Sequence, residues 1–338
     1  MEKKISPNDK IFIAGSKGMV GSSINRALIK KGYGKNNKGG VIFTPGRNEL
    51  DLLDSNNVDK WFKENKPSIV IIAAAKVGGI LANKTKPYDF IIENLKIQSN
   101  LIENSFKNGV KKLLFLGSSC IYPKFSKQPI KEEYLLTDSL EQTNEFYAIS
   151  KIAGIKLCES LRKQHKFDAI SLMPTNLYGP RDNYHLANSH VLPALIRKFS
   201  EAKELNKNEV ICWGTGKPLR EFLYVDDLAE ACIFVLEKCF GDIKDKENLI
   251  KDEVSWLNVG SKYEISIKDL AKKIALKCGY KGKVIWDHSK PDGTPRKKLD
   301  ISKLSNLGWE AKTNLDVGIS KTIDSYNNEK KSDTLRQV

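Results

Sequence analysis

The chain has 338 residues, 40% of them hydrophobic, which is enough for one large domain or two smaller ones. No apolar run is long enough to span a bilayer, and no apolar signal-peptide segment follows the charged N-terminus. The six cysteines form no C-x-x-C pair, which argues against a zinc site or a disulfide framework. We therefore expect a cytoplasmic protein. The net charge of +15 is compatible with nucleic-acid binding, but the lysines are spread over the whole length without a basic stripe. We therefore expect no nucleic-acid partner, and a positive field that would favour an anionic nucleotide or nucleotide-sugar.

A glycine-rich turn with the spacing G-x-x-G-x-x-G follows the first apolar segment, residues 11–14, and leads into a predicted helix over 22–29. Glycines permit a tight turn and let the backbone approach a pyrophosphate, which the N-terminus of the helix then attracts. The pattern predicts a dinucleotide site formed by Gly15, Ser16, Lys17, Gly18, Met19, Val20 and Gly21.

The end of the second predicted strand, residues 41–43, bears on the choice of cofactor. Folds of this kind that bind NAD usually place an acidic residue here to hold the ribose hydroxyls, but this chain has no acid before Glu49. Arg47, together with Lys17, could instead pair with a 2′-phosphate, so we expect NADP(H). The alternative is that Arg47 is a solvated loop residue.

Small and polar residues mark the next part of the expected cofactor site. Asp54, which precedes a predicted helix over 55–65, is a candidate for the adenine end. The apolar run 69–75 predicts a third strand, and Ala74 and Ala75 at its end leave room for a cofactor to lie across it. In the long helix expected over 87–107, Asn94 is the candidate to face the cofactor.

Residues 112–117 (KLLFLG) form an apolar run that predicts a buried parallel strand, and it ends in Ser118. About thirty residues later, Tyr147 and Lys151 stand four apart on a predicted helix and therefore share one face. A lysine beside a phenol favours the phenolate, which would make the tyrosine a proton donor and acceptor near neutral pH. The Y-x-x-x-K pattern is weak alone, but with the serine and the glycine-rich turn it indicates a catalytic pair.

Polar groups gather again after the predicted strand 168–173, near the place where a nicotinamide would lie. The residues are Pro174, Thr175, Asn176 and Leu177. Strand and helix alternate up to this point, which predicts an α/β fold with a doubly wound parallel sheet of Rossmann type.

The pattern then changes, and we divide the chain accordingly. Residues 8–177 are expected to form the dinucleotide-binding domain, with 222–260 returning to it. Residues 178–221 and 261–326 are expected to form a smaller mixed α/β substrate lobe, and 327–338 a polar, frayed tail.

Seven segments between residues 12 and 297 resemble one family. The glycine-rich turn, Ser118 and the Tyr147–Lys151 pair are similar to those of the extended short-chain dehydrogenase/reductases, and within that superfamily the chain resembles the GDP-L-fucose synthases. The segments are FIAGSKGMVGS (12–22), AAAKVGGI (73–80), LLFLGSSCIYPK (113–124), YAISKIAGIKLCES (147–160), MPTNLYGP (173–180), NSHVLPAL (188–195) and SKPDGTPRK (289–297).

The resemblance implies 3,5-epimerisation of GDP-4-keto-6-deoxy-D-mannose and NADPH-dependent reduction at C4 to GDP-L-fucose. A 4-ketone acidifies the protons on C3 and C5, and inverting each centre needs a base on one face and an acid on the other. The resemblance assigns these roles to Cys120 and His190, and it also places His190 at the cofactor. Ser118 and Tyr147 would bind the C4 oxygen, Tyr147 would protonate it, and Lys151 would lower the tyrosine pKa and hold the nicotinamide ribose.

For the GDP-sugar the resemblance suggests Ser119, Asn176, Lys198, Trp213, Arg220 and Lys290. Two departures from the family pattern are that Lys198 and Lys17 stand where arginines are usual. The resemblance also implies a homodimer in contact through helices at 87–107 and 146–162.

Two alternatives remain open. A sugar-nucleotide 4-epimerase or 4,6-dehydratase belongs to the same superfamily, but dehydratases typically place acids after the fourth strand, and this chain has none before Glu132. A non-catalytic NADP-sensing or RNA-binding protein on the same fold would suit the positive charge, although such proteins usually lack the Tyr-x-x-x-Lys pair.

Overall fold

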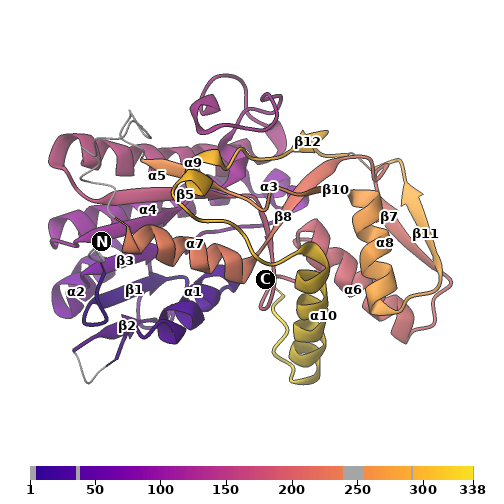
Figure 1. Ribbon diagram of the computed structural model, residues 1–338, viewed down its shortest axis with the longest axis horizontal. Helices are drawn as coiled ribbons and strands as arrows, with labels where there is room; N and C mark the ends of the chain where they lie inside the picture. The colour runs from indigo at the N-terminus through magenta and orange to yellow at the C-terminus, as the bar shows by residue number, and fades with distance from the viewer. Residues whose placement is uncertain (1–4, 36–38, 239–254, 291, 338) are drawn as a thin grey trace.

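A parallel sheet of six strands, in the order β2-β1-β3-β4-β5-β9, forms the centre of the protein (Figure 1). The computed structural model describes residues 5–35, 39–238, 255–290 and 292–337. The strands are β1 (Lys10–Ala14), β2 (Val41–Phe43), β3 (Ile69–Ile72), β4 (Lys112–Leu116), β5 (Ala169–Pro174) and β9 (Trp256–Val259).

The strands form because their residues are apolar on both faces. In β1, Ile11 and Ile13 enter the core on one side of the sheet, while Phe12 and Ala14 enter the core on the other. This continuous apolar pattern is typical of parallel strands that are covered on both sides. It confirms the predicted doubly wound sheet.

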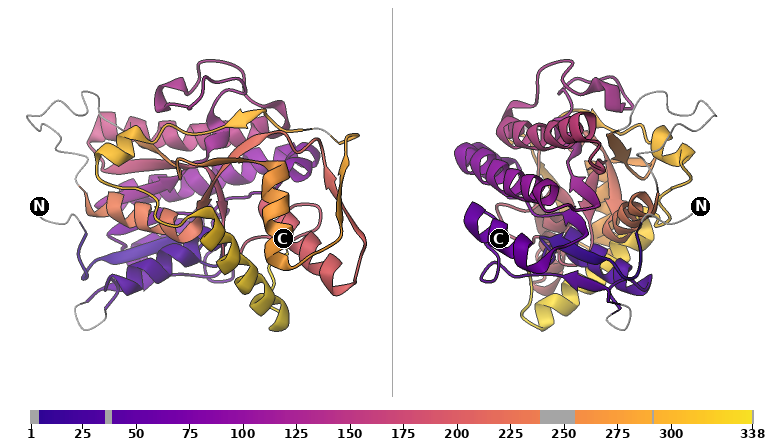
Figure 2. Two further views of the ribbon diagram at one scale, coloured as in Figure 1. Left: turned by 45° about the vertical axis from the view of Figure 1, so that its right-hand side comes forward. Right: turned by 90° about the vertical axis from the view of Figure 1, so that its left-hand side faces the viewer.

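Helices cover both faces of the sheet (Figure 2). On one face α1 (Met19–Lys30) packs against α7 (Val225–Glu237), with α9 (Ser302–Asn306) near β9. On the other face lie α2 (Ser55–Asn65), α4 (Pro87–Lys107) and α5 (Glu145–His165), of which α4 and α5 make an extensive contact. The short helix α3 (Ile80–Thr85) and the 3-10 turns η2 (Ser119–Ile121), η3 (Glu132–Tyr134) and η4 (Gln142–Asn144) lie in the connections.

A second lobe carries its own core. Strand β8 (Leu219–Tyr224) pairs with β10 (Glu264–Ser266), β12 (Arg296–Lys297) and β6 (Asn176–Tyr178), and β7 (Glu209–Trp213) pairs in parallel with β11 (Lys283–Asp287). Around these strands lie α6 (Val191–Glu204), α8 (Ile267–Cys278) and α10 (Leu315–Lys331).

The segment 222–260 is divided between the two bodies. Its first residues belong to β8 in the lobe, whereas α7 and β9 lie on and in the main sheet, and residues 239–254 lie outside the described ranges. The prediction of a frayed tail from residue 327 is wrong for the residues that the structure describes. Helix α10 continues to Lys331, and the Tyr184 amide donates a hydrogen bond to the carbonyl oxygen of Arg336.

Candidate active site

The turn after β1 has no room for side chains at two of its glycines. Gly15 has a φ of +85°, and a Cβ on it would lie 2.7 Å from the amide nitrogen of Ala74. A Cβ on Gly21 would collide with the carbonyl oxygen of Gly15. The turn therefore leaves a bare backbone cradle at the N-terminus of α1, beside the Ala74–Ala75 segment, and this is the surface that a pyrophosphate needs. The residues present fit a dinucleotide.

Two cations stand at the end of β2, where the sequence analysis expected a 2′-phosphate. The Lys17 ammonium lies 2.8 Å from the place that a Cβ on Gly46 would occupy, so the first loop reaches the loop after β2. Arg47 is next in the chain, and its side chain is 76% exposed with only a distant contact, 4.0 Å, to Asp51. Both side chains can therefore turn towards an anion.

Two of the predicted cofactor residues, Asp54 and Asn94, make hydrogen bonds to nearby backbone groups. Asp54 caps α2, because its Oδ1 accepts hydrogen bonds from the amides of Asn56 and Asn57. Asn94 is buried, and its amide group bonds the backbone N–H and carbonyl of Lys76 and the carbonyl of Phe90. The Asn94 side chain therefore fixes the backbone after Ala75, and its expected place beside the cofactor stays a prediction.

Ser118, Tyr147 and Lys151 come together at the carboxyl end of β4. The Ser118 side chain accepts a hydrogen bond from the Cys120 amide at 3.2 Å and is also hydrogen-bonded to Tyr147. The Lys151 ammonium donates to the carbonyl oxygen of Leu116 at 2.8 Å, and it lies 6.0 Å from the centre of the Tyr147 ring.

The expected lowering of the tyrosine pKa is not found in this geometry. Burial raises the pKa of Tyr147, and the hydrogen bond with Ser118 offsets this only in part. Burial also lowers the pKa of Lys151 to about 7, so its ammonium is readily lost near neutral pH. Desolvation disfavours both charged forms and here outweighs the attraction between them, because the Lys151 ammonium is directed at a carbonyl rather than at the phenol.

Cys120 is only partly covered, whereas the other four described cysteines are buried; Cys239 lies outside the described residues. The Lys297 ammonium lies 3.7 Å from the Cys120 sulfur, and Arg220 is close enough for its charge to act on the thiol. Sequence reasoning missed Lys297, although it ends the segment 289–297. Only the structure reveals its place, because the pairing of β12 with β8 puts Lys297 beside Arg220.

His190 stands at the N-terminus of α6, after a loop that contacts the turn following β3. His190 is exposed as a residue, and desolvation by the surrounding protein lowers its pKa. A neutral imidazole can both accept and donate a proton, as an acid–base group requires.

Three of the predicted substrate residues form one cluster in the lobe. The Trp213 side chain is exposed, and the ammonium groups of Lys198 and Lys290 lie 5.6 and 5.7 Å from its ring centre. Lys198 also donates to the carbonyl oxygen of Ile211 at 3.1 Å. An exposed indole between two cations suits a ligand that carries an aromatic base and phosphates.

Thr175 and Asn176, which the sequence analysis expected at the ligands, make hydrogen bonds to the backbone. Both side chains donate to the backbone carbonyl of Glu221, so they tie the end of β5 to β8. The Glu221 carboxylate is fully buried and accepts hydrogen bonds from the amides of Ser261, Lys262 and Leu299. This carboxylate, which sequence reasoning also missed, joins three segments around the neighbouring Arg220. Ser119 is buried in η2.

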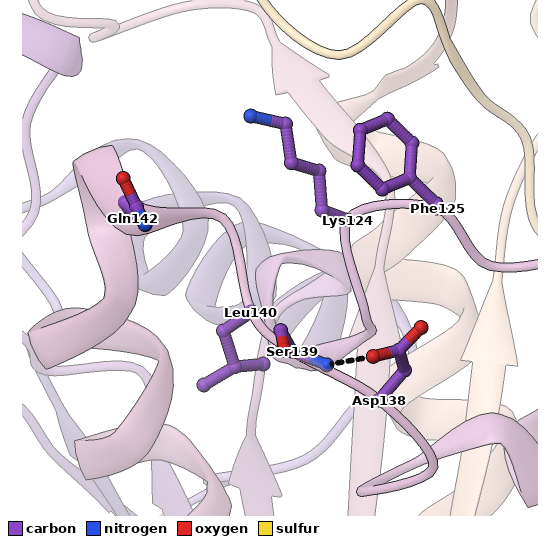
Figure 3. A pocket seen from close by; sticks show the side chains of 6 residues that line it. All are labelled: Lys124, Phe125, Asp138, Ser139, Leu140 and Gln142. Atoms are coloured by element: carbon purple, nitrogen blue, oxygen red, sulfur yellow. Dashed lines mark hydrogen bonds between the residues drawn. The ribbon is translucent and has the colours of Figure 1, made fainter.

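A separate hollow of about 310 Å³ lies on the connection between β4 and α5 (Figure 3). Its walls are Lys124, Phe125, Asp138, Ser139, Leu140 and Gln142, and none of these is a predicted site residue. Lys124 is paired with Glu141 at 3.0 Å. Within the described ranges, the structure contains no cluster of ligands for a metal ion and no helix that could cross a membrane.

Comparisons with known proteins agree with this geometry. A model of the NAD dependent epimerase/dehydratase family matches residues 11–248. The chain is 54% identical to GDP-L-fucose synthase 1 of Arabidopsis thaliana over 317 residues, covering 94% of this chain and 93% of the relative. It is 50% identical to GDP-L-fucose synthase of Escherichia coli (strain K12), covering 94% and 96%. Among solved structures, the GDP-mannoheptose C4 reductase from Campylobacter jejuni with NADP bound matches with a TM-score of 0.84 at 38% identity, covering 96% of this chain and 99% of that chain.

Proposed function

The chain belongs to the NAD dependent epimerase/dehydratase family, and from this we propose that it converts GDP-4-keto-6-deoxy-D-mannose to GDP-L-fucose by 3,5-epimerisation and NADPH-dependent reduction. The observation that carries the proposal is the meeting of two kinds of chemistry at the end of β4. The Ser118–Tyr147 pair suits a carbonyl oxygen, and Cys120 beside Lys297 suits proton abstraction. The identity to the GDP-L-fucose synthases of Arabidopsis thaliana and Escherichia coli, 54% and 50%, exceeds the 38% identity to the heptose reductase.

The cofactor site supports NADP(H). The backbone from Gly15 to Gly21 would hold the pyrophosphate, and Lys17 and Arg47 would hold the 2′-phosphate. NADPH, when bound, supplies the hydride that reduces C4. Lys151 would bind the nicotinamide ribose, since its ammonium lies at the carboxyl end of β4.

Replacing Lys17 by alanine is expected to raise the KM for NADPH about fivefold and to leave the KM for NADH unchanged. An exposed ammonium that pairs with a phosphate contributes about 1 kcal/mol, since solvent screens it, and NADH lacks that phosphate. Steady-state kinetics with both cofactors measure the effect. The matched control is Lys30→Ala, which removes an exposed lysine at the far end of α1. An equal rise in both KM values would place Lys17 away from the 2′-phosphate.

The epimerisation is assigned to Cys120 and His190. Cys120 removes the proton from C3 or C5, and His190 returns a proton to the opposite face. The Lys297 ammonium lies 3.7 Å from the Cys120 sulfur, so a positive charge stands next to the proposed base. Ser118 and Tyr147 donate hydrogen bonds to the C4 oxygen, so the negative charge of the enolate is held where it develops.

The reduction uses the same oxygen contacts. Tyr147 gives its proton to the C4 oxygen as C4 becomes tetrahedral, and Ser118 keeps the oxygen in place. A phenol with a raised pKa remains protonated at neutral pH and can serve as this donor. Lys151, with its pKa near 7, can then return a proton to the phenolate.

The nucleotide part of the substrate is assigned to the lobe. Trp213 would stack on the guanine or pack against the sugar, with Lys198 and Lys290 at the phosphates and Arg220 between them and Cys120. Glu221 and the Asn176 and Thr175 side chains hold the strand that carries Arg220.

The main alternatives lack support at this site. A dehydratase needs an acid near the C4 ketone, but Glu132 is buried and accepts a hydrogen bond from the amide of Asn258. The Tyr147–Lys151 pair with its serine would have no use in a protein that only senses NADP or binds RNA.

We also propose that the enzyme works in the cytoplasm as a homodimer in contact through α4 and α5. Tyr88, Phe146 and Ile149 are exposed near the N-termini of these helices. The thiols of the described cysteines are free, in keeping with a reducing compartment.

The experiment that tests the proposed function mixes the purified protein with GDP-4-keto-6-deoxy-D-mannose and NADPH. Absorbance loss from the reduced nicotinamide, with GDP-L-fucose as the product by NMR, supports the proposal. No oxidation with this substrate, but oxidation with a GDP-linked 4-keto-heptose, would overturn it.

A further inference from the structure

The short turn after β3, residues 76–79, touches the loop that leads to His190. The amide of Gly79 donates a hydrogen bond to the carbonyl oxygen of Asn188 at 2.8 Å. A Cβ on Gly79 would lie 2.9 Å from the carbonyl oxygen of Ser189. The backbone immediately before His190 therefore rests directly on Gly79, and no larger residue fits at this position without moving it.

A buried side chain holds this turn in place. The Asn83 amide group is 7% exposed, and its Nδ2 donates to the carbonyl oxygens of Gly78 at 2.8 Å and of Gly79 at 3.0 Å. At the other end of the turn, Asn94 accepts from the amide of Lys76 at 2.8 Å. Two buried asparagines thus fix the orientation of the peptide groups from 76 to 79.

The loop on the other side of the contact has its own internal support. The Nδ1 atom of His185 accepts hydrogen bonds from the amides of Ala187 and Asn188, at 3.1 and 3.2 Å. The amide of Ser189 donates to the carbonyl oxygen of His185. Residues 185–189 therefore form a compact turn, and a backbone hydrogen bond from Gly79 to Asn188 joins this turn to the segment after β3.

Gly78 lies beside Phe90, which in turn packs against Tyr147. A Cβ on Gly78 would lie 3.1 Å from the Phe90 ring, and Phe90 packs edge-on against Tyr147 with ring centres 6.4 Å apart. Gly78 therefore lies next to the ring that packs against Tyr147, whereas Gly79 contacts the backbone that precedes His190.

We propose that Asn83 and the Gly78–Gly79 turn are positioning residues that set the place of His190 relative to the substrate carbons. This inference rests on the proposed function, because it assigns His190 to proton transfer at C3 and C5. Asn83 orients the two glycine carbonyls, the Gly79 amide then points at Asn188, and the position of the histidine two residues later is fixed. A displacement of about 1 Å in an acid–base group can cost about 100-fold in rate.

The test compares Asn83→Ala and Gly79→Ala with the wild-type enzyme in D₂O. With GDP-4-keto-6-deoxy-D-mannose and NADPH, NMR gives the deuterium incorporated at C3 and C5 and the configuration of each product. We expect both variants to incorporate about tenfold less deuterium per NADPH oxidised, because reduction overtakes inversion when His190 is misplaced. Part of their product should therefore keep the substrate configuration at C3 or C5.

The matched control is Asn104→Ala, which removes another buried asparagine whose Nδ2 donates to a backbone carbonyl, that of Asn100, far along α4. It is expected to match the wild type in deuterium per NADPH. The inference is overturned if Asn83→Ala and Gly79→Ala lose NADPH oxidation and deuterium uptake in equal proportion, or if they behave as the control does. If Gly79→Ala does not fold, Asn83→Ala decides alone. Failure of the wild type to oxidise NADPH would instead refute the proposed function.

Discussion

Replacing Tyr147 by phenylalanine is expected to lower the rate of NADPH oxidation by roughly two to four orders of magnitude while some exchange of the substrate protons with solvent persists. In the proposed mechanism the phenol is the proton donor to the C4 oxygen, and no other protonated group has that task. Exchange at C3 and C5 would depend on Cys120 and His190, and Ser118 would still donate one hydrogen bond to the enolate. The aromatic ring remains, so its packing against Phe90 is kept.

Stopped-flow absorbance measures the reduction, and NMR of the unreacted substrate in D₂O measures the exchange. Tyr122→Phe is a matched control, since this buried phenol donates to Asn258 at 2.6 Å and belongs to the same strand end. It should lower stability and leave both rates close to those of the wild type. If Tyr147→Phe oxidised NADPH at the rate of the wild type, the proton donor would have to be sought elsewhere.

Replacing Cys120 by serine is expected to slow the epimerisation by about 100-fold and to change the product. A hydroxyl occupies almost the same volume, but an alcohol is a far weaker acid than a thiol, so serine cannot replace cysteine as the base. Ser118, Tyr147 and Lys151 are unaltered, so the ketone that has not been inverted is still reduced. The product should keep the substrate configuration at C3 or C5.

NMR of the product and its deuterium content in D₂O measure this outcome. Cys278→Ser is the control, because this buried cysteine lies in the lobe and its sulfur is hydrogen-bonded with Ser200. Lys297→Met should act in the same direction as Cys120→Ser, since the positive charge 3.7 Å from the Cys120 sulfur is lost. A fully active Cys120→Ser enzyme would show that another group is the base.

The sequence was sufficient to predict the parallel sheet and the cradle after β1, because both depend on local patterns. Apolar runs such as 112–117 have strand length and end in small polar residues, and the glycine spacing fixes the turn whatever lies around it. The pair Tyr147 and Lys151 was also predictable from spacing, since the helix alone puts both on one face.

Contacts between distant segments could not be predicted in this way. Lys297 reaches Cys120 only because the two-residue strand β12 pairs with β8, and a strand of that length has no recognisable pattern. Asn94 has the residue type of a ligand contact, yet its side chain is hydrogen-bonded to the nearby backbone of Lys76 and Phe90. The tail looks polar, but the docking of Arg336 against Tyr184 depends on a surface formed elsewhere.

The ionisation of the catalytic pair is a further case. Spacing shows that a lysine and a phenol are neighbours, and the expected consequence was a lowered tyrosine pKa. Burial has the larger effect, because it raises the pKa of Tyr147 and lowers that of Lys151 to about 7. How strongly a group is desolvated depends on the whole fold, and no motif reports it.

The most direct test of the central claim, that one pocket performs two inversions and one reduction, is the wild-type reaction in D₂O with NADPH. The account predicts GDP-L-fucose with deuterium at C3 and C5 and protium at C4, because the first two positions receive solvent protons and the third receives the cofactor hydride. Product that retains protium at both C3 and C5 would contradict it, since the enzyme would then reduce its substrate without inverting it.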